Sequence, residues 1–135
     1  MQLLVRFTLW AAAAATALLV DVITKAAPHQ LVVNHYSHTS WLVLSVVGIS
    51  LYALGLWHSN TLAVGAGLMF GGLCGNGGQL LLYGYASDWI PVGGWLTNAA
   101  DIAGALGLVC CFAGCLLSPR HRCPERAEFD KSQPE

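Results

Sequence analysis

Between Phe7 and Pro119 the chain carries formal charge on only four side chains, namely Asp21, Lys25, Asp88 and Asp101. Every other side chain in this stretch is apolar, small or neutral polar. A charged side chain costs about 2.5–3.5 kcal/mol at the centre of a bilayer on insertion scales. We therefore expect a chain that lies in a membrane and retains these four groups because it uses them.

The composition supports a membrane protein with one folded domain. Of the 135 residues, 56% are hydrophobic and 10% are charged, and the mean hydropathy is +0.59. A net charge of −1 gives no support for a nucleic-acid partner. The five cysteines have neither the spacing of a zinc site nor that of a disulfide framework, so we interpret them as packing residues.

Four segments are long and apolar enough for a spanning helix, which needs roughly 20 residues. They are Leu4–Ile23, Trp41–Trp57, Thr61–Tyr83 and Asn98–Leu117. The predicted fold is an all-α membrane protein with a four-helix transmembrane domain at residues 1–118, and residues 119–135 are predicted to be a disordered tail. A cleaved signal peptide is the alternative for the first segment.

The basic residues predict the orientation of these spans. Arg6 precedes the first span and four basic residues follow the last one, whereas only Lys25 lies on the opposite side. The positive-inside rule then places both termini in the cytoplasm. The two longer links, residues 26–40 and 84–97, then share the extracytoplasmic face.

Three glycines recur at intervals of four in the third span, at Gly67, Gly71 and Gly75. This spacing places them on one face of a helix, where a second helix can approach closely. We interpret the glycine face as a packing surface.

Asp88 and Asp101 are the candidate catalytic pair. Asp88 follows the third span and Asp101 lies one turn into the fourth, so the hairpin between them can bring the two carboxyls together. Two close carboxylates in a poorly hydrated site share one proton, which provides an acid and a base in one place. The alternatives are a helix-dipole role for Asp101, worth about 0.3–1 kcal/mol, and an ordinary loop position for Asp88.

Four further polar residues are candidates for the same site. Asp21 and Lys25 are spaced as an i,i+4 ion pair, and we favour a structural role in which the lysine stem reaches outward to the interface. Asn98 lies three residues before Asp101 and can cap the fourth helix. Asn76 lies within an apolar span, so its amide must find partners inside the bundle.

At these residues the chain resembles the lipoprotein signal peptidases, the signal peptidase II family of bacterial inner membranes. Residues 21–25 (Asp-Val-Ile-Thr-Lys) are similar to the family's D-x-x-[ST]-K, and residues 75–76 (Gly-Asn) to the opening of its third-span motif. Residues 84–90 (Gly-Tyr-Ala-Ser-Asp-Trp-Ile) resemble its G-[YF]-V-[VI]-D-[FM]-I, and residues 98–101 (Asn-Ala-Ala-Asp) match its N-x-A-D. The order and the intervals agree over roughly residues 4–117.

The resemblance implies an intramembrane aspartic endopeptidase that uses no metal or other cofactor. Its partners would be membrane lipids and the signal peptide of a prolipoprotein, cut before a cysteine that carries diacylglycerol. Asp88 and Asp101 would be catalytic by position. The substrate-binding residues would be Asn76 and Asn98, beside the dyad or the scissile backbone, and Asp21 and Lys25, at the outer end of the site.

The chain also departs from the family pattern. The family motif G-N-x-x-[DN]-R would place an acid or amide and then an arginine where this chain has Gln79 and Leu80. The family's N-x-G segment after the first span is not recognisable, and Asn34 is the nearest candidate. The resemblance implies a small β element in the extracytoplasmic loops, and we expect a reduced one because the link at residues 26–40 is short for the family's small sheet. These departures leave open an inert paralogue that acts as a membrane binding or assembly subunit. A small transporter or proton-relay subunit is a third hypothesis.

Overall fold

The computed structural model describes residues 1–26, 32–34, 47–48, 50 and 59–117. Of the predicted span at 41–57, only residues 47, 48 and 50 are described, as helical, and the rest lies outside the described residues. The predicted tail at 119–135 also lies outside them. The four-span plan and the cytoplasmic placement of both termini therefore stay predictions.

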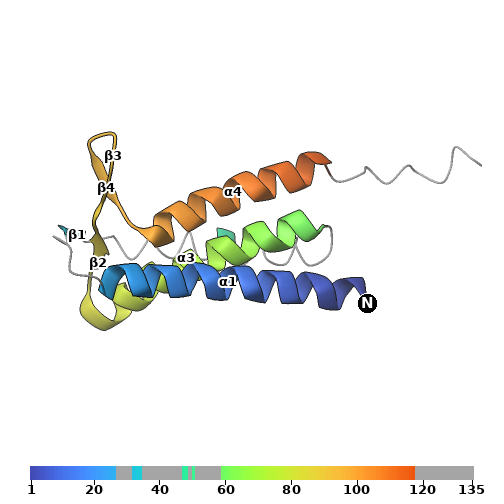
Figure 1. Cartoon of the computed structure of the whole chain (residues 1–135), viewed down its shortest axis with the longest axis horizontal. Helices are drawn as coiled ribbons and strands as arrows, with labels where there is room; N and C mark the ends of the chain where they lie inside the picture. Colours follow the sequence, from blue (N-terminus) through green and yellow to red (C-terminus); the bar gives the residue numbers. More distant parts are fainter. Residues whose placement is uncertain (27–31, 35–46, 49, 51–58, 118–135) are drawn as a thin grey trace, which may run out of the picture.

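The described part of the bundle is built from the long helices α1 (Gln2–Ala26), α3 (Asn60–Tyr83) and α4 (Ala99–Leu117). Their bounds lie close to those of the three corresponding predicted spans, which confirms those predictions as helices. Helix α3 packs extensively against both α1 and α4, whereas α1 and α4 touch each other much less. Figure 1 shows the three helices side by side, with the strands gathered at one end.

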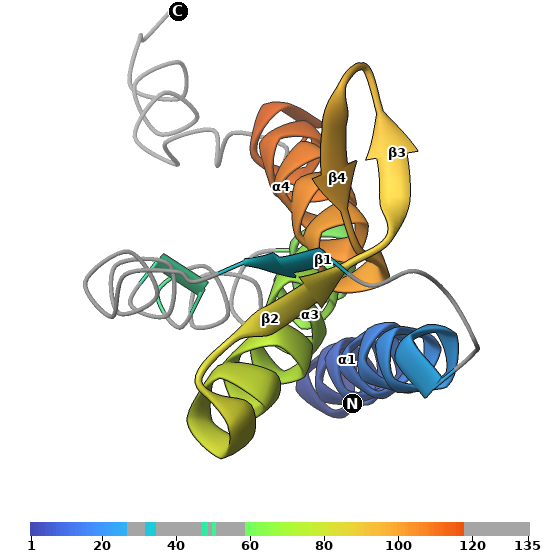
Figure 2. The same ribbon diagram turned by 90° about the vertical axis from the view of Figure 1, so that its left-hand side faces the viewer.

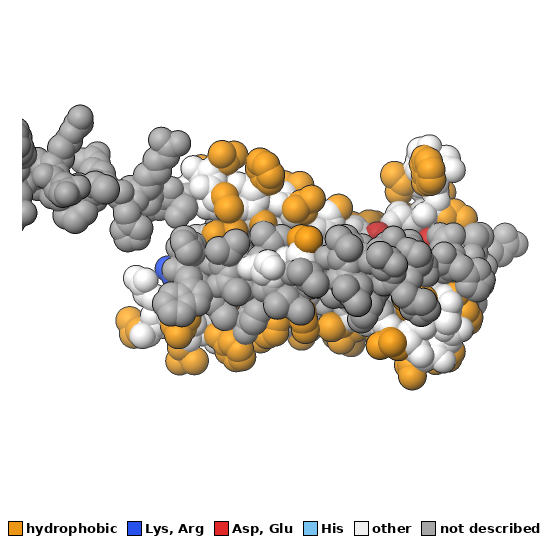
Figure 3. Space-filling view, turned by 180° about the vertical axis from the view of Figure 1, so that it is seen from behind, with side chains coloured by type: hydrophobic (Ala, Val, Ile, Leu, Met, Phe, Trp, Pro, Cys, Tyr) orange, Lys and Arg blue, Asp and Glu red, His pale blue; other side chains and the backbone are white. Residues whose placement is uncertain are grey.

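The outer surface of the described helices suits contact with lipid. Among them, α1 and α4 are long and apolar enough to cross a membrane. Large apolar side chains are exposed along both, for example Leu19 at 59%, Val109 at 65% and Phe112 at 70%. Figure 3 shows hydrophobic side chains along the edges of the visible face and acidic atoms near one end only. These features are those of a membrane protein.

The glycines of α3 let its backbone approach both neighbouring helices. A Cβ atom on Gly67 would lie 2.9 Å from the Cβ of Ala13, and one on Gly71 would lie 2.8 Å from the Cβ of Ala17, both on α1. On the other side, a Cβ on Gly65 would lie 2.7 Å from a carbonyl oxygen of α4. These approaches are too close for any side chain, so the prediction of a glycine packing face is confirmed.

Two small antiparallel sheets lie at one end of the bundle (Figures 1 and 2). Strand β1 (Val32–Asn34) pairs with β2 (Ala86–Asp88). Strand β3 (Ile90–Val92) pairs with β4 (Trp95–Thr97) through a turn at Gly93 and Gly94, whose φ values are 53° and 89°. Two successive positive φ values suit a tight hairpin turn and favour glycine at both positions. The prediction of a reduced β element is confirmed.

The end of α3 determines how the chain enters β2. Gly84 adopts the left-handed conformation with φ 79°, and its N–H donates to the carbonyl of Leu80 at 2.9 Å. This C-cap stops the helix and turns the chain back. Strand β2 begins two residues later, at Ala86, and ends at Asp88. The cap therefore carries one of the two candidate acids back toward the bundle.

Candidate active site

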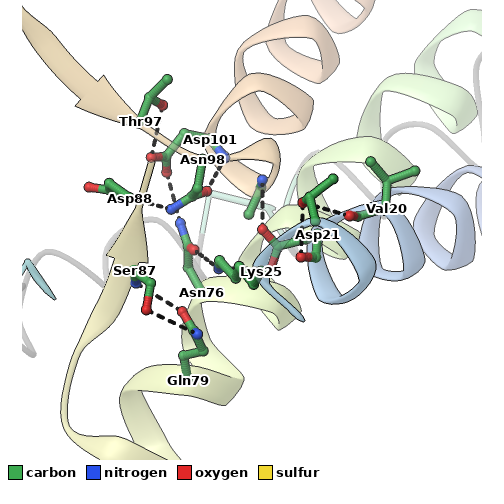
Figure 4. Close-up of polar contacts among 12 residues, drawn as sticks. Val20, Asp21, Lys25, Asn76, Gln79, Ser87, Asp88, Thr97, Asn98 and Asp101 are labelled. Carbon is green, nitrogen blue, oxygen red and sulfur yellow. Dashed lines mark hydrogen bonds and ion pairs between the residues drawn. The ribbon is translucent and has the colours of Figure 1, made fainter. Parts of the chain in front are cut away.

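Two carboxylates from separate elements meet at the strand-bearing end of the bundle. Asp88 ends β2 and Asp101 lies in the first turn of α4. Asp88 is 0% exposed and Asp101 is half-buried. Asn98 contacts both residues, and Figure 4 shows both acids beside it. The predicted convergence is therefore present.

Asn98 connects the two acids through its amide group. Its Nδ2 donates a hydrogen bond to Oδ1 of Asp88, and its Oδ1 accepts the backbone N–H of Asp101 at 3.0 Å. The second contact is an N-cap of α4, as the sequence predicted. Because Asn98 is 0% exposed, both amide ends work without competition from water. One side chain therefore sets the start of α4 and orients Asp88 beside it.

The Asp101 carboxylate has a donor on each oxygen. Oδ1 accepts from Nδ2 of Asn76 at 2.8 Å, and Oδ2 accepts from the hydroxyl of Thr97 at 3.1 Å. The predicted inward orientation of Asn76 is confirmed. Thr97 was not predicted from the sequence, although its position four residues before Asp101 was a signal that could have identified it.

Asp21 and Lys25 form the predicted ion pair, at 2.8 Å between Nζ and Oδ2. The expectation that the lysine stem reaches outward is wrong, because the Lys25 side chain is only 6% exposed. Its ammonium group also donates to Oδ1 of Asn76 at 2.8 Å, which holds it inside the bundle. A hydrogen-bonded chain thus runs from Asp21 through Lys25 and Asn76 to Asp101 (Figure 4).

Asp21 also joins α1 to the start of α4. Its Oδ1 accepts the backbone N–H of Ala100 at 3.1 Å, and the residue is 1% exposed. Gly75 of α3 lies directly against this carboxylate, where any Cβ atom would clash with it. The three helices therefore meet at one buried acid. This arrangement gives the Gly-Asn pair of α3 two tasks, since Gly75 makes room for Asp21 and Asn76 binds Lys25.

Gln79 and Ser87 form a further contact next to the acids. The Gln79 Oε1 accepts the backbone N–H of Ser87 at 2.9 Å, and its Nε2 donates to the Ser87 hydroxyl at 3.3 Å. From the sequence, Gln79 was identified only as a departure from a family pattern, and Ser87 was not predicted. No local spacing rule predicts a contact between a helix and a strand that follows it.

The arrangement can perform acid–base chemistry with the two carboxyls. Lys25 donates to Asn76 and Asn76 donates to Asp101, so an amide lies between this ammonium group and the Asp101 carboxylate. Two such carboxyls can hold one proton between them, with one acting as base and the other as acid. In the part of the chain that the structure describes, no group of three or more His, Cys, Asp and Glu side chains lies together as a metal site would require.

Comparisons with known proteins identify the fold. No protein family matches the sequence, and no curated protein matches it. Two solved structures, both described as a bacterial membrane enzyme determined by the in meso method, align with a TM-score of 0.64. One, at 1.9 Å resolution, is 19% identical over 80% of this chain and 92% of that chain. The other, at 2.3 Å, is 18% identical over 92% of both chains. The chain therefore has the fold of a bacterial membrane enzyme.

Proposed function

We propose that this chain is an intramembrane aspartic endopeptidase that removes signal peptides from diacylglyceryl-modified prolipoproteins at the bacterial inner membrane. The observation that carries the proposal is the link that Asn98 makes between Asp88 and Asp101. The four motifs described above supply the substrate class by resemblance. A fold shared with a bacterial membrane enzyme is consistent with both.

The proposed reaction uses the two acids in opposite protonation states. The ionised carboxyl takes a proton from water, and the oxygen of that water attacks the scissile carbonyl carbon. The protonated carboxyl gives its proton to the carbonyl oxygen, so that a neutral tetrahedral intermediate forms. When the C–N bond breaks, the carboxyl that took the proton from water gives it to the leaving nitrogen. One hydroxyl of the intermediate returns its proton to the other carboxylate, so the pair is back in its starting state.

The other polar residues hold the acids in place. Asn76 and Thr97 donate to Asp101, and Asn98 donates to Asp88, so the carboxyls keep a fixed orientation before substrate binds. Lys25 donates to Asn76 and is itself paired with Asp21, so this ion pair holds Asn76 beside Asp101. Because exposed apolar side chains cover the surface of the helices, a lipid-anchored substrate can approach from within the bilayer.

The test is cleavage of a diacylglyceryl-modified prolipoprotein by the purified chain in detergent or liposomes. Asp88→Asn and Asp101→Asn keep the side-chain size but remove the shared proton, and each should abolish cleavage. Thr8→Asn is the matched control, because Thr8 is exposed at the opposite end of α1. The Thr8→Asn protein should cleave the substrate as the wild type does. Unchanged turnover in either aspartate variant would defeat the proposal.

A second candidate function is that of a catalytically inert subunit that binds or assembles other membrane proteins. The observation that favours it is Leu80, which is 6% exposed and occupies the position where the resembled family has arginine. Expression in cells depleted of their own lipoprotein signal peptidase separates the two candidates. Maturation of precursors supports the peptidase. Failure to process, together with co-purification of one fixed partner, supports the subunit.

A further inference from the structure

Helix α3 presents two amide side chains to the acids from adjacent turns. Asn76 and Gln79 are three residues apart, which places them on neighbouring positions of one helix face. Asn76 donates directly to Asp101, whereas Gln79 reaches the strand that carries Asp88. Figure 4 shows the two amides extending from the same helix toward the two halves of the site. One face of α3 therefore contacts both acid-bearing segments.

Gln79 binds Ser87 at two points. The amide oxygen accepts the Ser87 N–H at 2.9 Å and the amide nitrogen donates to the Ser87 hydroxyl at 3.3 Å. Ser87 is 2% exposed, and Asp88, the next residue, is 0% exposed. A buried backbone N–H left without a partner is destabilising, so this strand depends on the glutamine.

The glutamine takes the place of a neighbouring strand along one edge of β2. On the other edge, β1 pairs with β2 in the register Val33 to Ser87. Because the Ser87 N–H donates to Gln79, that N–H is not part of the ladder with β1. Strand β2 has only three residues and is therefore held between β1 on one side and the Gln79 amide on the other.

We propose that Gln79 is a positioning residue that fixes β2 and thereby sets the location of the Asp88 carboxyl relative to Asp101. This inference rests on the proposed peptidase function. Reacting groups must be held within about 0.5 Å of their productive geometry. A displacement of about 1 Å can cost roughly a hundredfold in rate. Releasing one edge of a three-residue strand next to Asp88 permits such a displacement.

The test uses variants that remove both contacts, keep both or remove only one. Gln79→Met has nearly the same shape without either hydrogen bond. Gln79→Glu retains the acceptor for the Ser87 N–H, and the Ser87 hydroxyl can rotate to donate to it. Ser87→Ala loses only the longer, 3.3 Å contact. Leu82→Met is the matched control, because Leu82 lies on the same helix and is 77% exposed.

We expect kcat for prolipoprotein cleavage to fall roughly 10- to 100-fold in Gln79→Met, with KM changed less than about threefold. Gln79→Glu should restore kcat to within about threefold of the wild type, and Ser87→Ala should lie between the two. In Gln79→Met the acidic and alkaline limbs of the pH profile should also move, since the two carboxyls interact less strongly when Asp88 is displaced. A residue that only stabilises the fold would change none of these quantities per molecule of folded enzyme.

Hydrogen exchange at the Ser87 amide separates this inference from the proposed function. Its protection should fall about tenfold or more in Gln79→Met and stay unchanged in Leu82→Met. If the wild type cleaves and Gln79→Met retains its kcat and pH profile, the inference is overturned. If the wild type cleaves no prolipoprotein, the proposed function fails, and the exchange rate of this amide alone then decides whether Gln79 holds β2.

Discussion

Asp21 offers the sharpest test of how the helices are joined. Asp21→Ala removes the acceptor for the Ala100 N–H and the partner of Lys25, whose side chain is 6% exposed. Removing one partner of a buried ion pair costs about 3–5 kcal/mol, because the remaining charge stays buried. The lost hydrogen bond to α4 acts at the same carboxylate, so the two effects are not additive. We expect a loss of roughly 4 kcal/mol in the free energy of unfolding.

Reversible unfolding in mixed micelles with increasing dodecyl sulfate would measure this loss. Val22→Ala is the matched control, because Val22 is 54% exposed on the same helix turn and should cost no more than about 1 kcal/mol. The double variant Asp21→Ala/Lys25→Met removes both charges and should be more stable than Asp21→Ala alone. A single variant within about 1 kcal/mol of the wild type, or a double variant no more stable than the single one, would refute the reasoning.

Two further predictions concern packing and protonation. Gly71→Ala should destabilise the protein, because the added Cβ would clash with α1. Gly78→Ala should stabilise it by up to about 1 kcal/mol, since a Cβ there meets no atom within 4 Å and alanine favours helix. Equal unfolding midpoints for the two variants would contradict this prediction. The rate of cleavage should pass through a maximum as pH rises. When Asp88 and Asp101 are both protonated the pair lacks a base, and when both are ionised it lacks a proton donor. A rate that rises steadily across the acidic and neutral range would count against the shared proton.

The helices were predictable because hydropathy is a local property of the sequence. The predicted span Thr61–Tyr83 differs by one residue at its start from α3, which begins at Asn60. The ion pair of Asp21 and Lys25 and the Asn98 cap follow from spacings within one or two turns, and the structure confirms both. Each of these features depends only on neighbours along the chain.

The burial of Lys25 could not be predicted in the same way. An i,i+4 spacing gives a salt bridge but does not say which way it faces, and the exposed arrangement was a reasonable expectation. The direction was decided by Asn76, fifty-one residues away, which accepts a hydrogen bond from the ammonium group. Gln79 and Ser87 were missed for the same reason, since their contact depends on the path of the chain after Gly84.

The sequence by itself determined that the chain excludes nearly all charge between Phe7 and Pro119, forms long apolar helices and retains three acids and one lysine within or beside them. It also identified Asp88 and Asp101 as candidates that a hairpin could bring together. Only the tertiary structure decided how those groups are held, because hydrogen bonds among α1, α3, α4 and β2 join residues far apart in the chain. The physical reason is that buried polar groups must be satisfied wherever the fold places them, and their partners are fixed by packing rather than by spacing along the sequence.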